Sequence, residues 1–243
     1  TSQNFAGGSG TDTLVIDASE LTGARFSGGL TVGRLFDSQL GTDVNLSGFE
    51  RLEFTGNATG ASFSGGVTGG SGDDKLTGLG GNDVFSGGAG DDIMVGAGGN
   101  DTLNGGTGNN VIDGGAGTDT ATLDYSDRTG DLVLINGAAS GVVYTATVGG
   151  VDAGTIKDIE VLNVTGGSGN DRIGALLSVA ATSQTFAGGS GTDTLVIDAS
   201  ALTGARFGGG LTIGRIFDSQ LGTDVFLSGF ERLEFTGNAT GAS

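Results

Sequence analysis

The sequence contains no cysteine, histidine, proline or tryptophan among its 243 residues. Without cysteine there are no disulfides, and without cysteine and histidine neither zinc ligation of the usual kind nor thiol or imidazole catalysis is available. Only 10 Lys and Arg stand against 28 Asp and Glu, which gives a formal net charge of −18. This charge disfavours binding to nucleic acid or anionic lipid. No apolar run reaches the roughly 18 residues of a membrane span. We therefore expect no nucleic-acid partner and no membrane insertion.

Glycine, by contrast, is abundant, with 53 residues. A disordered linker has a similar glycine content, but here 36% of the residues are hydrophobic, and Phe alone occurs 13 times. The apolar residues recur in short runs, such as residues 14–16, 52–54 and 132–135. Runs of this length bounded by glycine are typical of strands joined by turns. The sequence therefore predicts an ordered, all-β protein.

A long internal repeat dominates the chain: residues 1–62 recur at 182–243, an offset of 181. The two copies differ at six positions, Asn4/Thr185, Glu20/Ala201, Ser27/Gly208, Val32/Ile213, Leu35/Ile216 and Asn45/Phe226. Near-identical copies of a long segment are typical of stalks, sheaths and lattices, in which the number of repeats sets a length or an area. We expect the chain to be part of a longer protein of this kind, with no enzymatic activity.

A short repeat of nine residues fills positions 69–122. The six copies read GGSGDDKLT, GLGGNDVFS, GGAGDDIMV, GAGGNDTLN, GGTGNNVID and GGAGTDTAT. The first six residues of each copy suit a turn and the last three a strand, and the eighth residue is apolar in every copy. Copies one, three and five resemble each other, as do two and four, so the underlying period is 18 residues. We therefore expect two nonapeptides per coil and turns stacked in two columns.

This pattern, G-G-x-G-x-D-x-U-x, resembles the hemolysin-type calcium-binding repeats of the RTX family. The resemblance implies a right-handed parallel β-roll, a form of β-solenoid, flanked by further β-strand blocks. It also implies Ca²⁺ ions shared between turns n and n+2 and bound by the side chains at the sixth position. These are Asp74, Asp92 and Asn110 in one column and Asp83, Asp101 and Asp119 in the other. Six turns paired in this way give four complete sites, and the site that includes Asn110 lacks one charge, so we expect it to be weaker.

Single matches to the pattern lie outside the array and add Asp12, Asp171 and Asp193 as candidate ligands. Aspartate is also a good turn former, which leaves a purely structural role open for these three residues. Four other aspartates have no such context, and we expect them in solvated loops: Asp37, Asp43, Asp218 and Asp224.

We divide the chain into four parts. Residues 1–68 form a first strand block, 69–122 the nonapeptide array, 123–181 a second strand block with an isolated turn at 166–174, and 182–243 the start of the next repeat unit. The second block resembles the first, since residues 114–126 match 7–19 and residues 159–166 match 49–56. The strands of 127–158 are recognisable, but their pairing is left open.

The function that these features favour is a calcium-dependent structural module of a large secreted bacterial cell-surface protein. An adhesin stalk, a surface filament or an S-layer would use neighbouring copies of the repeat as its partners. RTX proteins leave the cell unfolded through a type I system, and a chain without disulfides or slow prolyl isomerisation suits that route. The alternatives are the folding and secretion module of a toxin or hydrolase, and a polysaccharide-binding module of a secreted enzyme.

Overall fold

The computed structural model describes residues 2–20, 24–29, 32–37, 42–56, 66–136, 143–175, 183–198, 205–209, 213–218 and 223–236. The regular structure of these residues is β-strand. Over the same residues, no helix has the length and hydropathy needed to cross a membrane. The chain forms two compact units, Thr1–Ala121 with Ile156–Ile159 and Thr122–Thr155 with Glu160–Ser243. The fold is all-β, as the sequence predicts.

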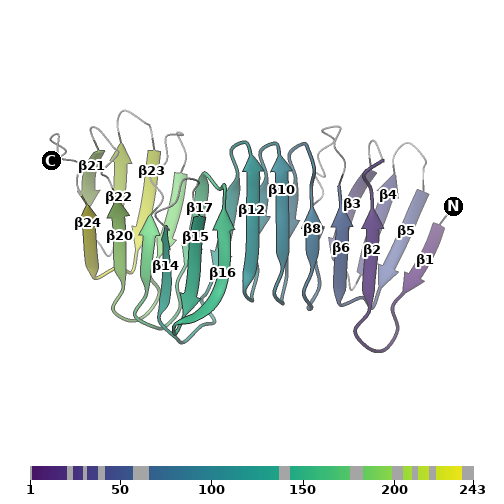
Figure 1. Ribbon diagram of the computed structural model, residues 1–243, viewed down its shortest axis with the longest axis horizontal. Coiled ribbons are helices and arrows are strands. Elements are labelled where there is room, and N and C mark those ends of the chain that lie inside the picture. The colour runs from purple at the N-terminus through teal and green to yellow at the C-terminus, as the bar shows by residue number, and fades with distance from the viewer. Residues whose placement is uncertain are drawn as a thin grey trace. The chain divides into compact units, whose positions relative to one another are not determined.

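The first unit has strands from two sheets. One sheet contributes, in spatial order, β1 (Ser2–Ala6), β5 (Thr42–Ser47), β4 (Val32–Asp37), β3 (Ala24–Gly29), β7 (Val67–Thr68), β9 (Val84–Ser86) and β11 (Thr102–Asn104). The other contributes β2 (Thr13–Asp17), β6 (Arg51–Thr55), β8 (Lys75–Thr77), β10 (Ile93–Gly98) and β12 (Asn110–Ala116). Figure 1 shows the second set side by side in one layer.

The nonapeptide array is a parallel β-roll with a period of 18 residues. Met94 of β10 lies opposite Leu76 of β8 on one side and Ile112 of β12 on the other. In the other sheet Leu103 of β11 lies opposite Phe85 of β9. Each register joins nonapeptide n to n+2, which confirms the stacking expected from the alternating copies.

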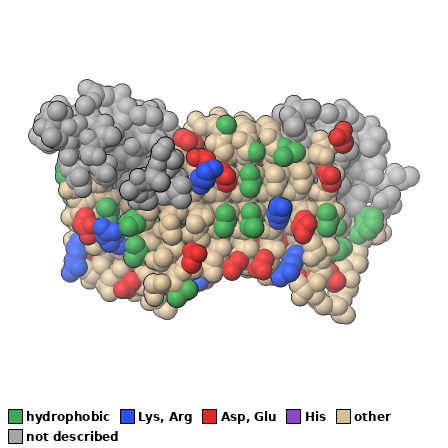
Figure 2. Space-filling view, in the orientation of Figure 1, with side chains coloured by type: hydrophobic (Ala, Val, Ile, Leu, Met, Phe, Trp, Pro, Cys, Tyr) green, Lys and Arg blue, Asp and Glu red, His purple; other side chains and the backbone are tan. Residues whose placement is uncertain are grey.

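The core of the roll consists of the side chains at the eighth position. Six of them are at most 1% exposed: Leu76, Phe85, Met94, Leu103, Ile112 and Ala121. The side chains at the seventh position point outward, and Val84, Ile93 and Val111 are 42–44% exposed. On the face drawn in Figure 2, hydrophobic and charged side chains form small separate groups among backbone and other side chains. Each nonapeptide thus buries about one apolar side chain, which is a small contribution to stability.

The turns of the roll need residues that tolerate positive φ. Gly88 and Gly90 have φ values of 108° and 119°. Copies two and four have Leu79 and Ala97 at the second position, with φ values of 76° and 75°. Left-handed backbone costs a residue with a side chain about 1–2 kcal/mol. The rest of the fold therefore has to offset this cost at these two turns.

The strand block before the array combines parallel stacking with an antiparallel meander. Strand β2 pairs in parallel with β6, and β1 with β5, as in the roll. Strands β3, β4 and β5 pair antiparallel in chain order. Our expectation that Asp37 and Asp43 lie in loops was wrong, because they belong to β4 and β5. The core of this block includes Phe49 and Phe54, which are 9% and 1% exposed.

The second unit repeats this architecture. One set of strands contains β13 (Thr120–Asp124), β17 (Val161–Thr165), β19 (Ser183–Ala187), β23 (Thr223–Ser228), β22 (Ile213–Asp218) and β21 (Ala205–Gly209). The other contains β16 (Val151–Lys157), β15 (Val143–Val148), β14 (Leu132–Asn136), β18 (Arg172–Ala175), β20 (Thr194–Asp198) and β24 (Arg232–Thr236). Asp218 and Asp224 lie in β22 and β23, again on strands and not in the loops we expected.

The pairing that the sequence left open is an antiparallel one. Strands β14 and β15 form a ladder from Leu132 opposite Val148 to Asn136 opposite Tyr144. Strand β14 then pairs in parallel with β18, and β18 with β20. An antiparallel excursion thus returns the chain to the parallel stack, as the β3–β4–β5 meander does in the first unit.

Two of the six differences between the repeat copies are explained by register. Asn4 and Asn45 lie opposite each other on β1 and β5, and Asn45 Nδ2 donates to Asn4 Oδ1 at 3.0 Å. In the second copy both positions change, and Thr185 lies opposite Phe226 on β19 and β23. An exposed amide pair is thereby exchanged for a β-branched and aromatic pair, a combination that is favourable across strands.

Candidate calcium site

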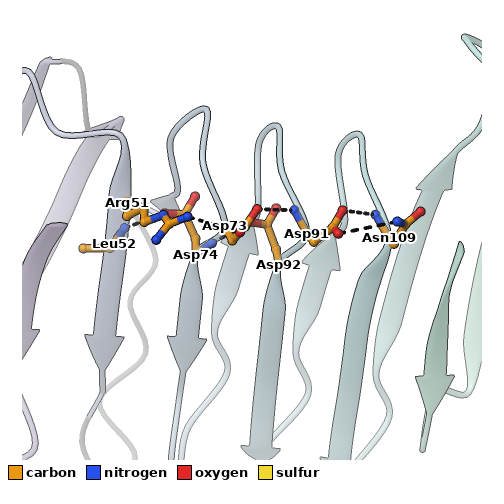
Figure 3. Close-up of polar contacts among 7 residues, drawn as sticks. All are labelled: Arg51, Leu52, Asp73, Asp74, Asp91, Asp92 and Asn109. Atoms are coloured by element: carbon orange, nitrogen blue, oxygen red, sulfur yellow. Dashed lines mark hydrogen bonds and ion pairs between the residues drawn. The ribbon is translucent and has the colours of Figure 1, made fainter. Parts of the chain in front are cut away.

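The sixth residue of each nonapeptide lies at the start of a strand, and from the third copy on its side chain accepts a hydrogen bond from the coil before it. In the column that precedes β8, β10 and β12, the N–H of Asp74 donates to Asp92 Oδ1 at 2.8 Å. The N–H of Asp92 donates in turn to Asn110 Oδ1 at 2.9 Å. Figure 3 shows the first of these contacts between neighbouring turns. We call this arrangement of sixth-position side chains the inner ladder.

The second column has the same arrangement before β9, β11 and β13. The N–H of Asp83 donates to Asp101 Oδ1, and the N–H of Asp101 to Asp119 Oδ1, both at 2.7 Å. All six sixth-position side chains of the array are buried, with exposures of 0–6%. The structure thus brings the predicted residues together in two columns, one per coil edge.

The hydrogen bonds between coils use only Oδ1 of the aspartates. Oδ2 of Asp74 accepts from the N–H of Gly70 at 2.6 Å within its own turn. Over the described residues, Oδ2 of Asp92 and Oδ2 of Asp101 are buried and accept no hydrogen bond. A buried carboxylate oxygen without a donor is costly, and a cation is the usual partner for such a group. These oxygens are therefore suited to bind a metal ion.

Glycine at the first position leaves room beside these oxygens. A Cβ on Gly87 would overlap Asp92 Oδ2 and lie 2.7 Å from the carbonyl oxygen of Gly105 in the next coil. Gly96 has the same relation to Asp101 Oδ2 and to the carbonyl oxygen of Gly114. The first glycine thus lets a carboxylate oxygen and a carbonyl oxygen of neighbouring turns share one space.

Asn110 is the exception in the inner ladder, and it fills that space by itself. Its Nδ2 donates to the carbonyl oxygen of Gly105 at 3.0 Å, while its Oδ1 accepts from Asp92. An aspartate in the same position has an oxygen in place of this donor. The side chain of Asn110 therefore donates to the carbonyl of its own turn without an ion, whereas an ionised aspartate has no hydrogen to donate there.

The charge of the inner ladder is poorly compensated. The pKa of Asp92 is raised to about 7, chiefly by burial and also by the nearby carboxylates of Asp74, Asp73 and Asp91, against one backbone hydrogen bond that lowers it. Burial likewise raises the pKa values of Asp74 and Asp101. Arg51 lies at the end of this column but forms its ion pair with exposed Asp73 at 3.3 Å. A divalent cation would relieve this destabilisation.

A second ladder lies outside the first and was missed in the sequence analysis. It is formed by fifth-position side chains and runs in the opposite direction, so that the later coil donates to the earlier one. Asp73 Oδ1 accepts from the N–H of Asp91 at 3.0 Å, and Asp91 Oδ1 from Asn109 at 2.9 Å (Figure 3). In the other column the N–H of Asn100 donates to Asn82 Oδ1 at 2.8 Å. The fifth position was readable as Asp or Asn in five of six copies, but a preference for turns explained it equally well.

The isolated turns also belong to inner ladders. In the second unit the N–H of Leu132 donates to Asp171 Oδ1, and the N–H of Asp171 to Asp193 Oδ1, both at 2.8 Å. Both aspartates are at most 1% exposed, and burial raises their pKa values. In the first unit the N–H of Asp12 donates to Glu50 Oε2 at 2.9 Å. Asp171 and Asp193 thus continue the inner ladder in the second unit, whereas Asp12 joins Glu50 through its backbone N–H.

Backbone oxygens are needed to complete any metal site here. Within the described ranges, no three side chains of Asp, Glu, His or Cys lie close enough to hold an ion by themselves. The carboxylates of one column follow each other one coil apart, so an ion between two coils meets few of them at once. Calcium takes six to eight oxygen ligands and accepts carbonyl oxygens. The combination of carboxylate and glycine carbonyl oxygens therefore fits calcium better than zinc or a redox metal.

Comparison with known proteins gives a family for this part of the chain. The model of the RTX calcium-binding nonapeptide repeat matches residues 68–103 and 95–122, with four copies. A search of the curated proteins finds no match to the chain. The matched residues coincide with the array in which the inner ladder is longest. Residues 68–122 are therefore an RTX calcium-binding nonapeptide repeat region, folded as a parallel β-roll.

Proposed function

We propose that the chain is a calcium-dependent structural repeat module of a secreted bacterial cell-surface protein. Its calcium ions lie between turn n and turn n+2 of each column. The side-chain ligands are Asp74, Asp83, Asp92, Asp101 and Asp119, with Asn110 at the weakest site and Asp12, Asp171 and Asp193 in the isolated turns. The observation that carries this proposal is the buried Oδ2 of Asp92 and Asp101, which accepts no hydrogen bond from the described residues.

Calcium in this arrangement controls folding. Without an ion, buried carboxylates stack at the normal strand spacing of about 4.8 Å, and one apolar side chain per nonapeptide does not offset that repulsion. Extracellular calcium modules bind with dissociation constants on the order of 10⁻⁴–10⁻³ M. The array is therefore unfolded at cytosolic calcium concentrations and folds outside the cell. This behaviour suits type I export of an unfolded chain and a final place at the cell surface.

The module is architectural because its repeat units stack on one another. Strands β17 and β18 pair in parallel with β19 and β20, at the start of the second copy of the long repeat. This stacking buries Phe186 completely, whereas the equivalent Phe5 of the first copy is 50% exposed. A unit stacked on β1 in the same way would bury Phe5 as well. Continuous stacking of this kind suits a stalk, a surface filament or an S-layer.

A calcium titration followed by far-UV circular dichroism and light scattering tests the proposal. The β-sheet signal is expected to appear at roughly millimolar calcium and not with magnesium, which keeps its water shell and demands octahedral geometry. Growth of particles at the same calcium concentration indicates stacking between chains, as in a filament or lattice. A folded chain that stays monomeric favours a stalk or the folding and secretion module of a toxin or hydrolase. A chain that is already fully folded in excess chelator contradicts calcium-controlled folding.

A further inference from the structure

The strand blocks end in a turn that differs from the nonapeptide but enters the inner ladder. In the second unit this turn is formed by Gly229, Phe230 and Glu231, just before β24. The N–H of Asp193 donates to Glu231 Oε2 at 2.8 Å, and the carbonyl oxygen of Asp193 accepts from the N–H groups of Glu231 and Arg232 at 3.1 and 2.9 Å. Glu231 therefore occupies the place that a sixth-position aspartate has in the array.

The oxygen environment beside Glu231 matches that of the array. Asp193 is fully buried, and its Oδ2 accepts no hydrogen bond from the described residues. A Cβ on Gly188 would overlap the carbonyl oxygen of Gly229 and lie 2.8 Å from Asp193 Oδ2. In the array, Gly87 faces the next coil's glycine carbonyl and a carboxylate oxygen in the same manner. A free carboxylate oxygen, a glycine carbonyl and a second carboxylate thus converge at one turn.

The same arrangement occurs at the other copy of the long repeat. Glu50 Oε2 accepts from the N–H of Asp12 at 2.9 Å, and a Cβ on Gly7 would overlap the carbonyl oxygen of Gly48. Oδ2 of Asp12 is also buried and accepts no hydrogen bond from the described residues. Gly48 and Gly229 have φ values of 66° and 70°, a conformation that favours glycine at both turns.

We propose that Glu50 and Glu231 each complete a calcium site, the first with the turn 7–12 and the second with the turn 188–193. This inference rests on the proposed calcium binding of the array but adds two sites that the nonapeptide pattern does not contain. The ligands are the aspartate Oδ2, the glutamate carboxylate, and the carbonyl oxygen of Gly48 or Gly229. The neighbouring residues Phe49 and Phe230, 9% and 0% exposed, anchor the two turns in the core.

Each of these sites joins the beginning and the end of a long segment of a strand block that leaves the parallel stack and returns to it. Asp12 and Glu50 are 38 residues apart in the chain, as are Asp193 and Glu231, whereas successive sixth-position residues of one array column are 18 apart. An ion bound between the aspartate and the glutamate fixes the end of the antiparallel meander to the parallel stack. Calcium thus orders the strand blocks together with the array.

Counting bound calcium tests this inference. The full chain and its Glu50→Gln/Glu231→Gln variant are compared by equilibrium dialysis against calcium at a concentration that saturates the wild type. Glutamine keeps an oxygen to accept the aspartate N–H, so the hydrogen bond is retained and the charge is lost. Glu53→Gln is the matched control, because Glu53 is an exposed residue of β6 in the same block.

The double variant is expected to bind two fewer ions than the wild type, each single variant one fewer, and Glu53→Gln the same number. Far-UV circular dichroism at saturating calcium verifies that the array still folds, and a single variant is used if the double variant does not. A double variant that binds as many ions as the wild type, with unchanged affinity, overturns the inference and leaves the array sites intact. A wild-type chain that binds no calcium instead overturns the proposed function.

Discussion

Replacing Asp92 by asparagine is expected to stabilise the calcium-free roll and to weaken the calcium-bound one. Asn110 provides the template, because its Nδ2 donates to the carbonyl oxygen of Gly105 in the same turn. At position 92 an asparagine would make the equivalent bond to Gly87 and would retain the acceptor for the N–H of Asp74. The substitution removes a buried charge, which stabilises the roll without calcium. It also removes one ligand oxygen, which destabilises the roll with calcium.

The size of this effect follows from the pKa of Asp92. Burial raises it from 3.8 to about 7 in the calcium-free fold. About three pH units at roughly 1.4 kcal/mol each correspond to a cost of about 4 kcal/mol when the carboxylate is ionised above pH 7. Because the folded pKa is the higher one, the folded state binds more protons between these values. The cost therefore falls as the pH decreases from 7 towards 4, and it disappears below the unfolded pKa of 3.8, where the group is protonated in both states.

Far-UV circular dichroism in calcium-free buffer from pH 4 to pH 8 measures the folded fraction. The wild type is expected to gain β-sheet signal as the pH falls, and Asp92→Asn to exceed it at pH 8 by the equivalent of about 4 kcal/mol. The two proteins should converge near pH 4. Asp91→Asn is the matched control, because Asp91 belongs to the exposed outer ladder. Equal stability of Asp92→Asn and the wild type at pH 8 would refute the reasoning.

Three further variants test separate parts of the structure. Gly87→Ala places a Cβ against Asp92 Oδ2 and is expected to abolish calcium-induced folding of the array, as measured by circular dichroism. Gly98→Ala is the control, because its Cβ meets no atom closer than 3.8 Å, and it should fold like the wild type. Asn110→Asp adds a charge to the weak site and should raise the calcium affinity measured by titration while lowering stability in chelator; an unchanged affinity would count against the site. Met94→Ala removes a fully buried core side chain and should lower the free energy of unfolding in urea, with calcium present, by about 2–5 kcal/mol. A decrease below about 1 kcal/mol would contradict the assigned core.

Much of the array could be predicted from its period. Identical turn chemistry every 18 residues fixes which coils stack, and the apolar eighth position fixes the inner face, as Met94 between Leu76 and Ile112 illustrates. The strand blocks could not be assigned in this way. Residues such as Asp37 and Asp43 carry the polar character of loops, yet they lie in β4 and β5, where an antiparallel meander sets their place. Long-range pairing of this kind leaves no period in the sequence.

The candidate site was predicted in the same uneven manner. The sixth-position aspartates recur at a fixed spacing, and the resemblance to the RTX repeat implied their role as ligands. The structure places them in two buried columns. Glu50 and Glu231 could not be found from the nine-residue spacing. Each accepts a hydrogen bond from the N–H of an aspartate that lies 38 residues earlier in the chain. The signal was present in the chain, since each glutamate follows a Gly-Phe pair within the repeated segment. Only the register of β2 with β6 and of β20 with β24 reveals what that pair positions.

The central claim is that calcium lies between successive inner-ladder turns. Anomalous scattering from crystals of the full chain grown with calcium tests it most directly. The account predicts ions in both columns, within about 2.3–2.6 Å of Oδ2 of Asp92 and of Asp101. Ions bound only at the exposed outer ladder of Asp73 and Asp91, or calcium-soaked crystals with both columns empty, would contradict it.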